Sequence, residues 1–174
     1  MDIEFIRTLS LEAGAMALNY FGHTTKTLKP DHTIVTQADV EIEQFLRREI
    51  SRRYPAHPIM GEEGKNPSKI DSEFVWALDP IDGTRAFSHG FPIWGVSIGL
   101  LRDGLPFLGA VYLPYLKELY DTDGVHAFLN RERLPQPHVE LNENAGFIVT
   151  ETIYRRWKID FQGAIFSLGS VAAH

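Results

Sequence analysis

The sequence of 174 residues contains no cysteine. This absence excludes a disulfide scaffold, a thiolate zinc site and a cysteine nucleophile. Basic residues are outnumbered as well, because 17 Lys and Arg stand against 23 Asp and Glu and leave a net charge of −6. A negative chain does not attract the phosphate backbone of nucleic acids, so we predict no nucleic-acid partner. An acidic protein that handles an anionic substrate needs bound cations.

Long apolar runs are missing too. No segment approaches the roughly 20 apolar residues that cross a bilayer. Residues 1–14 carry acids among their apolar positions instead of a basic segment followed by a continuous apolar one. We therefore predict no membrane association and a cytoplasmic location.

Apolar residues recur at helical spacing in two N-terminal segments. The first covers residues 6–20, and the second begins near Thr36 and ends at Tyr54, which precedes a proline. Residues 24–33 and 61–69 are rich in polar, Gly and Pro residues and are predicted to be loops.

Beyond residue 73 the pattern changes to that of short strands. Strands are predicted at residues 74–78, 93–101, 105–113, 118–121, 125–129, 147–150 and 164–166. Residues 102–104, Arg-Asp-Gly, are predicted to form a hairpin turn. Two helices followed by several antiparallel strands predict a layered α+β fold. A composition shift at residues 135–144 divides the chain into two predicted domains, 1–140 and 145–174.

The most informative segment is Trp76-Ala-Leu-Asp79-Pro-Ile-Asp82-Gly-Thr84, where an apolar strand runs into two aspartates. A strand that leads into a helix start presents unpaired backbone N–H groups, which favour bound anions, and Gly83 lets a ligand approach the backbone. Two carboxylates and a backbone carbonyl form an oxygen cage of the kind that Mg²⁺ prefers. The alternative is local, since Asp82 or Thr84 can cap a helix and Asp-Gly is a common turn.

Two further acidic positions precede this segment. Glu62 and Glu63 lie in a glycine-bounded turn, a pattern that alone favours solvated surface. Asp39 ends the sequence Thr36-Gln-Ala-Asp39, which alone favours a capping box over a catalytic role. Each position therefore has a structural alternative to the functional interpretation.

Clustering of these carboxylates would be costly without a cation. Two like charges about 4 Å apart repel by roughly 4 kcal/mol at an effective dielectric of about 20, so a group formed by the two glutamates and the two aspartates favours divalent cations. Oxygen ligands without cysteine or paired histidines favour Mg²⁺, with Mn²⁺ as the alternative, over Zn²⁺. Such sites polarise a phosphoryl group and generate hydroxide from water near neutral pH.

The chain resembles the inositol monophosphatase family, because it carries in order Thr-x-x-Asp, Gly-Glu-Glu and Trp-x-Leu-Asp-Pro-Ile-Asp-Gly-Thr. The stretches that follow in that family are similar to Phe87-Ser-His-Gly-Phe-Pro92, Val96-Ser-Ile-Gly-Leu100 and Pro106-x-x-Gly-Ala-Val-x-x-Pro114-x-x-x-Glu-x-Tyr120. The resemblance covers nearly the whole chain. It implies a layered α/β/α sandwich with an incomplete C-terminal layer. It also implies Mg²⁺-dependent hydrolysis of a small phosphate monoester, an inositol monophosphate or a related sugar or polyol phosphate, by metal-activated water.

The resemblance further implies a role for each candidate residue. The metal ligands would be Glu62, Asp79, Asp82 and the backbone carbonyl of Ile81. The catalytic residues would be Thr84, Asp39 and Glu63, with the Thr84 hydroxyl oriented by Asp39 toward the attacking water. Substrate contacts would come from the N–H groups of Gly83 and Thr84, and from Gly169, Ser170, Val171 and Ala172. For the last four residues the alternative is a helix start built from small packing residues.

One feature departs from the family pattern. The family has a further metal-ligating aspartate in a Trp-Asp-x-Ala type motif beyond the small-residue segment, whereas this sequence reaches His174 without one. We therefore expect a truncated chain, either a fragment or naturally short, with one firm metal site, a weakened second site and self-association, as a homodimer. The alternative is a catalytically weak or inactive homologue that binds metal, a phosphorylated sugar or a partner subunit.

Two other phosphate-handling classes do not fit the sequence. A haloacid-dehalogenase-type phosphatase needs Asp-x-Asp, whereas Asp79 and Asp82 are three residues apart with Pro80 between them. A P-loop enzyme needs Gly-x-x-x-x-Gly-Lys, which the sequence lacks.

Overall fold

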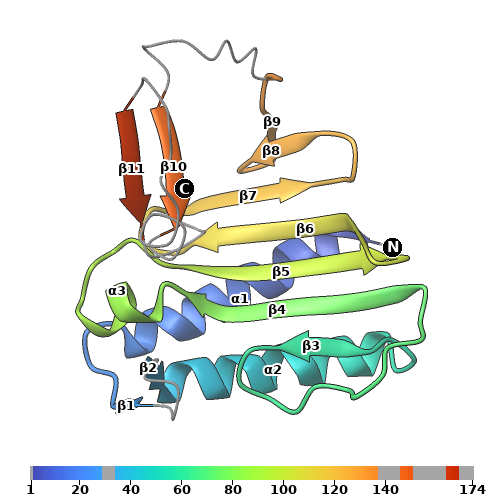
Figure 1. The fold of residues 1–174 in the computed structure, drawn as a ribbon, viewed down its shortest axis with the longest axis horizontal. Coiled ribbons are helices and arrows are strands. Elements are labelled where there is room, and N and C mark those ends of the chain that lie inside the picture. The colour runs from blue at the N-terminus through green and yellow to red at the C-terminus, as the bar shows by residue number, and fades with distance from the viewer. Residues whose placement is uncertain (1, 29–33, 137–145, 151–163, 169–174) are drawn as a thin grey trace.

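The computed structural model describes residues 2–28, 34–136, 146–150 and 164–168 of the chain. Its elements in chain order are α1 (Ile3–Tyr20), β1 (Lys26–Leu28), β2 (Ile34–Thr36), α2 (Gln37–Arg53), β3 (Ile59–Gly61), β4 (Phe74–Asp82), α3 (Thr84–Ser88), β5 (Gly95–Arg102), β6 (Leu105–Leu113), β7 (Glu118–Thr122), β8 (Ala127–Leu129), β9 (Glu132–Arg133), β10 (Gly146–Thr150) and β11 (Ala164–Leu168). Figure 1 shows the main sheet face-on, with the long helices behind it.

The main sheet has seven strands in the order β3-β4-β5-β6-β7-β8-β9. From β4 onward neighbouring strands are antiparallel, whereas β3 runs parallel to β4. β1 and β2 form an antiparallel pair, and β10 and β11 form a parallel pair. A mixed sheet with helices on one face is the α+β arrangement that the sequence predicts.

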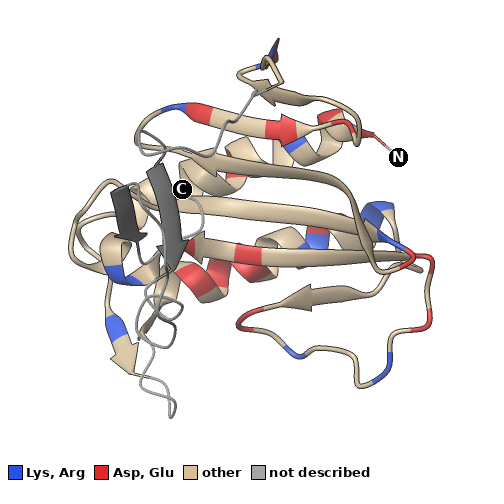
Figure 2. Ribbon diagram, turned by 45° about the horizontal axis from the view of Figure 1, so that its top comes forward, with Lys and Arg blue, Asp and Glu red and all other residues tan. Residues whose placement is uncertain are grey.

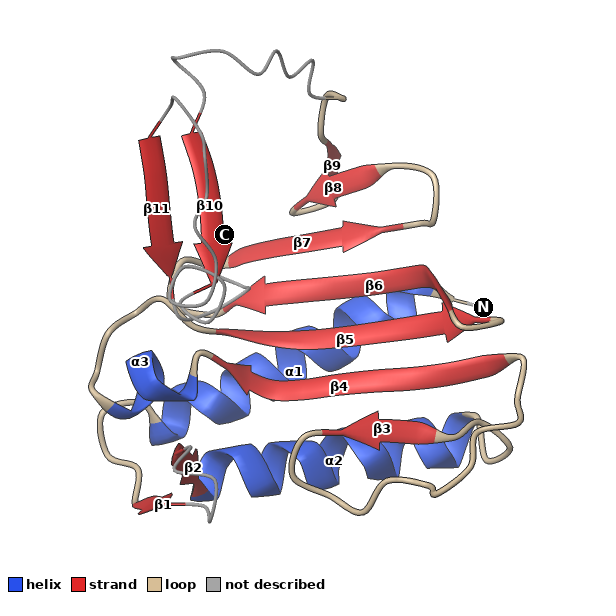
Figure 3. Cartoon of the chain, in the orientation of Figure 1, coloured by secondary structure: helices blue, strands red, loops and turns tan. Residues whose placement is uncertain are grey.

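Helices α1 and α2 lie on the same face of the main sheet (Figure 3). Each begins at a residue that satisfies free N–H groups of the first turn. Oδ1 of Asp2 accepts a hydrogen bond of 3.0 Å from the Glu4 N–H at the start of α1. Thr36 and Asp39 form a capping box at the start of α2. The capping box that the sequence predicts is therefore confirmed.

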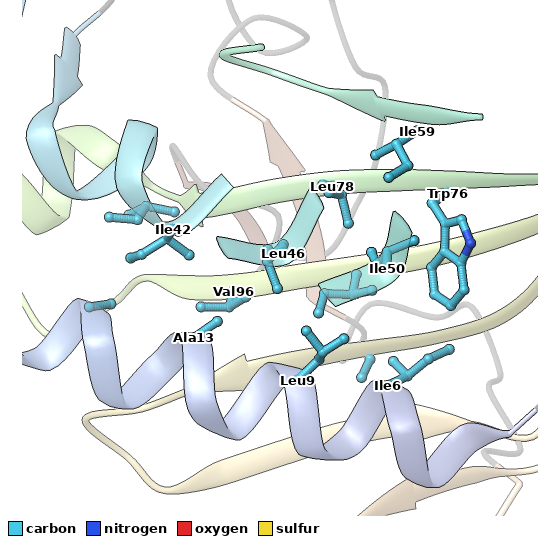
Figure 4. Packing of buried hydrophobic residues seen from close by; sticks show 14 of the residues in the cluster. Ile6, Leu9, Ala13, Ile42, Leu46, Ile50, Ile59, Trp76, Leu78 and Val96 are labelled. Atoms are coloured by element: carbon cyan, nitrogen blue, oxygen red, sulfur yellow. The ribbon is translucent and has the colours of Figure 1, made fainter. Parts of the chain in front are cut away.

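The hydrophobic core fills the space between these two helices and the sheet (Figure 4). Trp76 and Trp94, the largest fully buried side chains, are 1% and 0% exposed. β4 contributes Trp76, Leu78 and Ile81 to the core. Because burial of each such side chain stabilises the fold by about 1.5–3 kcal/mol, packing fixes the end of β4, where the acidic motif lies.

Short strands account for most of the differences from prediction. β1 lies within the predicted loop at residues 24–33, and β3 is not predicted at all. Both have only three residues, too few for a recognisable alternation, and their pairing partners determine their structure. The β5–β6 hairpin turn is confirmed, with positive φ at Asp103 (51°) and Gly104 (78°).

The predicted domain division lies mostly beyond what the structure describes. Residues 137–145 are outside the described ranges, and the division into 1–140 and 145–174 stays a prediction. Among the described helices, none is both long enough and apolar enough to cross a membrane.

Candidate functional site

The end of β4 carries the two aspartates within a continuing strand, and the strand does not stop at residue 78 as predicted. Asp79 pairs with Ser97 of β5 and Asp82 pairs with Gly95, so two residues of β4 face one residue of β5 between these pairs. This is a β-bulge, and Pro80 within it has no N–H to give to the ladder. Residues three apart in a regular strand point to opposite faces. The extra residue in the bulge changes this alternation between Asp79 and Asp82. The charge of Asp82 is in turn among those that raise the pKa of Asp79.

Asp79 is the most perturbed of these carboxylates. Its Oδ1 is buried and has no hydrogen-bond partner among the described residues. Burial, followed by the charges of Glu62, Asp82 and Asp39, raises the pKa of Asp79 from 3.8 to about 8. A buried carboxylate oxygen without a donor is costly, so this position favours a proton or a cation.

The parallel pairing of β3 and β4 explains how Glu62 reaches Asp79. Gly61, the last residue of β3, is in register with Leu78 of β4. Glu62 is the first residue after the end of β3, and Asp79 follows Leu78 on β4, so the parallel pairing brings the backbone at Glu62 near the Asp79 end of β4. The influence of the Glu62 charge on the pKa of Asp79 agrees with this placement. The Glu62 side of the site therefore depends on a strand that the sequence pattern does not reveal.

Thr84 connects the end of β4 to helix α2. Its Oγ1 lies 3.0 Å from Oδ1 of Asp39 and 3.0 Å from the carbonyl oxygen of Ile81. One hydroxyl hydrogen can serve only one of these acceptors at a time. Figure 2 shows the acidic residues gathered where the start of α2 lies beside the end of β4. The predicted contact between Thr84 and Asp39 is present.

Asp39 makes the capping contacts and the Thr84 contact with different oxygens. Oδ2 accepts the Thr36 N–H at 2.9 Å and also the Thr36 hydroxyl, whereas Oδ1 is the atom near Thr84. The side chain is 0% exposed. Burial raises the pKa of Asp39, and the bonds from Thr36 and Thr84 lower it. The capping and functional interpretations of Asp39 are therefore compatible, because a carboxylate has two oxygens.

Gly83 stands between Asp82 and helix α3 in a left-handed conformation, with φ 91°. A residue with a side chain is strained there, which explains the glycine of the motif. Its carbonyl oxygen accepts the Phe87 N–H at 3.0 Å, closing the first turn of α3. The backbone at Gly83 and Thr84 therefore turns sharply beside the aspartates.

The donor set suits a hard cation, although the ligands are not gathered into a cage. Among the described residues, no three His, Cys, Asp or Glu side chains lie close enough together to enclose a metal ion. The unpartnered Oδ1 of Asp79 and the oxygen-only donors, Asp82, Glu62 and the Ile81 carbonyl, fit Mg²⁺ or Mn²⁺ rather than Zn²⁺. The residues therefore fit the expected metal by donor type.

Four of the predicted substrate-contacting residues cannot be placed. Gly169, Ser170, Val171 and Ala172 lie outside the described residues. β11, which ends just before them at Leu168, pairs in parallel with β10. Their proposed contacts stay predictions.

Comparison with known proteins bears directly on this motif-bearing region. The model of the inositol monophosphatase family matches residues 3–166. The chain belongs to the inositol monophosphatase family. The match includes the metal motif, the glutamate turn and the capping box, and stops short of residues 169–172.

Curated members of the family share about a third of their aligned residues with this chain. A histidinol-phosphatase of Chlorobaculum parvum is 36% identical over 157 residues, which cover 88% of this chain and 60% of the relative. An inositol-1-monophosphatase of Synechocystis is 34% identical over 159 residues, which cover 90% of this chain and 55% of the relative. The chain thus spans little more than half the length of these curated relatives.

A solved family structure shows the same fold. The IMPase of Thermotoga maritima superimposes with a TM-score of 0.82 at 29% identity, covering 96% of this chain and 68% of that one. The layered arrangement implied by the resemblance is therefore confirmed as an inositol monophosphatase fold.

Sequence reasoning missed one polar side chain next to the family motif. Glu43 of α2 is 2% exposed, and its carboxylate accepts the backbone N–H groups of Glu63 and Gly64. The available signal was its spacing, because Asp39, Glu43 and Arg47 recur every four residues along one face of α2. The spacing places the three side chains on one face of the helix, but it does not by itself distinguish a buried polar face from a solvated one.

Proposed function

We propose that this site hydrolyses a small phosphate monoester with Mg²⁺, by orienting and activating a water molecule. The observation that carries the proposal is the 3.0 Å contact between the Thr84 hydroxyl and the buried Asp39 carboxylate, next to the unpartnered Oδ1 of Asp79. A capping box does not need that contact. Membership of a family whose relatives are named as phosphatases supports the same reaction class.

Asp79, Asp82, Glu62 and the Ile81 carbonyl would hold Mg²⁺, or Mn²⁺ in its place. When bound, the cation would polarise the phosphoryl group and favour ionisation of water near neutral pH. Its positive charge would also offset the burial and the neighbouring negative charges that together raise the pKa of Asp79.

Thr84 and Asp39 would handle the proton of the attacking water. While the Thr84 hydroxyl donates to Asp39, the lone pairs of Oγ1 are free to accept a hydrogen bond from water. The proton released by that water can then pass through the hydroxyl to Asp39. Burial raises the pKa of Asp39, which suits it to accept a proton. Glu63, half-buried beside Glu62, is the third candidate catalytic group.

The substrate would be a small phosphorylated polyol or sugar. The backbone N–H groups of Gly83 and Thr84 would contact its phosphate, because the left-handed turn at Gly83 leaves the backbone approachable. Gly169, Ser170, Val171 and Ala172 would contact its hydroxyl-bearing part. The names of the two curated relatives differ in substrate, so the proposal is for this substrate class.

We further propose that the chain forms a homodimer in the cytoplasm. Phe91, Tyr115 and Leu116 are 60%, 56% and 50% exposed, and burial of apolar side chains between two copies removes them from water. Light scattering over a range of concentrations checks the dimer, and a monomer throughout would contradict it. Cell fractionation checks the location, which rests on composition and charge.

A phosphate-release panel tests the proposed reaction. The purified chain is incubated with Mg²⁺ and a set of sugar and polyol phosphates, with and without EDTA, alongside Asp79→Asn. We expect release from at least one ester, and loss of release with EDTA or with Asp79→Asn. The matched control is Asp71→Asn, an exposed carboxylate paired only loosely with Lys69 at 3.9 Å.

Two results would contradict the proposal. Release that persists in EDTA would exclude the metal, and release by Asp79→Asn at the rate of the unchanged chain would exclude its ligand role. If no ester is hydrolysed while Mg²⁺ still binds, the alternative of a binding homologue without turnover replaces the proposed function.

A further inference from the structure

A buried carboxylate on α2 holds the turn at residues 61–64 from behind. Oε2 of Glu43 accepts the Glu63 N–H at 2.7 Å, and Oε1 accepts the Gly64 N–H at 2.7 Å. Oε1 also accepts Nε of Arg47 at 2.7 Å. The Glu43 side chain is 2% exposed, so these charge-assisted bonds are shielded from competing water. Both carboxylate oxygens are therefore used, and two of the three bonds are to the backbone of the turn.

The glycines of the turn leave the space that this carboxylate occupies. A Cβ at Gly64 would lie 2.5 Å from Oε1 of Glu43, and a Cβ at Gly61 would also overlap that oxygen. Neither glycine has a positive φ, so backbone strain does not explain them. Their role in the Gly-Glu-Glu-Gly sequence is to let the turn approach Glu43 closely.

Two further polar side chains, Arg47 and Asn66, also hold the turn at residues 61–64. Arg47 binds the Ile59 carbonyl at 3.2 Å and Oδ1 of Asn66 at 3.0 Å. Asn66 in turn accepts the Gly61 N–H at 2.8 Å and donates to the Gly61 carbonyl at 2.8 Å. Strand β3, the turn after it and α2 are thereby tied into one polar network. These bonds hold main-chain atoms at Ile59, Gly61, Glu63 and Gly64 in place.

Helix α2 therefore positions both halves of the candidate site. Asp39 contacts Thr84 at the end of β4, and Glu43, one helical turn later, holds the backbone beside Glu62. Residues four apart lie on the same face of a helix, so Asp39 and Glu43 are held at a fixed separation by α2.

We propose that Glu43 is a positioning residue, which fixes the 61–64 turn so that Glu62 faces Asp79 when Mg²⁺ binds. This inference rests on the proposed function of the site. Glu43 itself touches neither the metal nor the substrate in this proposal. Outer partners of this kind typically change metal affinity by about 10–100-fold when they are substituted.

Glu43→Gln tests the inference, because glutamine has the same length but replaces one acceptor oxygen with an NH₂ donor. We expect the Mg²⁺ dissociation constant, measured by calorimetry on the full chain, to rise by about ten-fold or more. Phosphate release at saturating Mg²⁺ should stay within about two-fold of the unchanged chain, because the catalytic groups remain. Hydrogen exchange of the Glu63 and Gly64 amides should accelerate, since one of them loses its acceptor.

Glu49→Gln is the matched control. It makes the same change on the same helix at a side chain that is 18% exposed and pairs with Arg48 and Arg52. We expect its Mg²⁺ affinity and amide exchange in the turn to equal those of the unchanged chain. If Glu43→Gln does not fold, Gly64→Ala replaces it, because the added methyl group displaces Oε1 of Glu43 and leaves α2 intact.

The outcomes separate this inference from the proposed function. Unaltered Mg²⁺ affinity in Glu43→Gln, with faster amide exchange in the turn, would overturn the positioning role and reduce Glu43 to a stabilising contact. Absence of Mg²⁺ binding by the unchanged chain would overturn both ideas. Mg²⁺ binding without phosphate release would contradict only the function, and the metal titrations of Glu43→Gln would still decide the positioning role.

Discussion

The end of β4 and the turn at residues 61–64 both bring carboxylates to the candidate site, but they are held by different forces. β4 is fixed by apolar packing, with Ile81 0% exposed between the two aspartates. The turn has exposed residues on both sides, and its backbone is held by hydrogen bonds to Glu43 and Asn66. One half is part of the core, and the other half is a loop attached to the core by polar contacts.

This difference predicts different sensitivities. Substitutions in β4 act on ligands that cannot move away, so they should change metal binding directly. Substitutions around the turn act on the position of a ligand that can move, so part of their effect should be recovered by raising the Mg²⁺ concentration. The predictions below test this contrast.

Asp79→Asn should have the largest effect. The Asp79 carboxylate is buried, and three other carboxylates act on its pKa. Its loss should therefore weaken Mg²⁺ binding by more than about 100-fold, which is beyond the range for partners that do not touch the metal. Glu62→Gln should weaken binding less, and Asp39→Asn least, because Asp39 acts through Thr84. Titration calorimetry of the three variants checks the order. An equal or larger loss at Asp39 would reverse the proposed roles.

Thr84→Ala should lower turnover by about 100-fold while Mg²⁺ affinity stays within about two-fold, because its hydroxyl is proposed to act on the attacking water. Thr84→Ser keeps the hydroxyl beside Asp39 and should recover most of the turnover. Steady-state phosphate release and calorimetry on both variants separate the two quantities. A matching drop in metal affinity would place Thr84 among the metal ligands instead.

Gly61→Ala should lower the free energy of unfolding by about 1–3 kcal/mol, because the added Cβ overlaps Oε1 of Glu43. The control is Gly99→Ala in β5, where the nearest atom would lie at 3.7 Å, an ordinary contact. Urea unfolding of both variants measures the difference. Equal free energies of unfolding for Gly61→Ala and Gly99→Ala would show that the turn can move away from Glu43 without loss of stability.

The smallest expected effect concerns pH and the metal-free chain. The raised pKa of Asp79, about 8 against 3.8, means that the folded chain holds this proton more tightly than the unfolded chain. The resulting stability is complete below about pH 4 and is lost as the pH rises to about 8. In EDTA, the unfolding temperature between about pH 6 and pH 7 should fall by about 3–5 °C more in the unchanged chain than in Asp79→Asn, because about 1.3 kcal/mol of stability is lost over that pH unit. Identical slopes would show that Asp79 is not protonated in the folded chain.

The sequence predicts the β4 half of the site better than the turn half. Asp79, Asp82 and Thr84 follow an apolar run within nine residues, and such a local pattern can be interpreted without knowing the fold. The bulge is not predictable in this way, because it depends on which residues of β5 lie opposite. For Asp39 the local pattern supports a capping box, and its second contact appears only when the end of β4 lies beside α2.

The turn half depends on contacts between distant segments. β3 has three residues and pairs with a strand that begins after a loop of exposed residues, so no periodicity marks it. Glu43 reads as an ordinary helix glutamate in sequence, because glutamate is common on solvated helix faces. Its burial follows from the turn that crosses over it. The sequence therefore shows the acidic residues of the turn half, but it does not show which residues they contact.

The four-residue spacing between Asp39 and Glu43 also limits how this chain can change in length. Each residue of a helix advances about 100° around the axis, since a turn contains 3.6 residues. A single insertion or deletion between these two positions would therefore rotate either Asp39 away from Thr84 or Glu43 away from the turn, while the other contact stayed in place. Between the turn and β4, residues 65–73 are almost all exposed and connect two elements already held by α2. Insertions and deletions should accordingly be tolerated at residues 67–72 and rejected at residues 40–42, a contrast that a library of length variants would display directly.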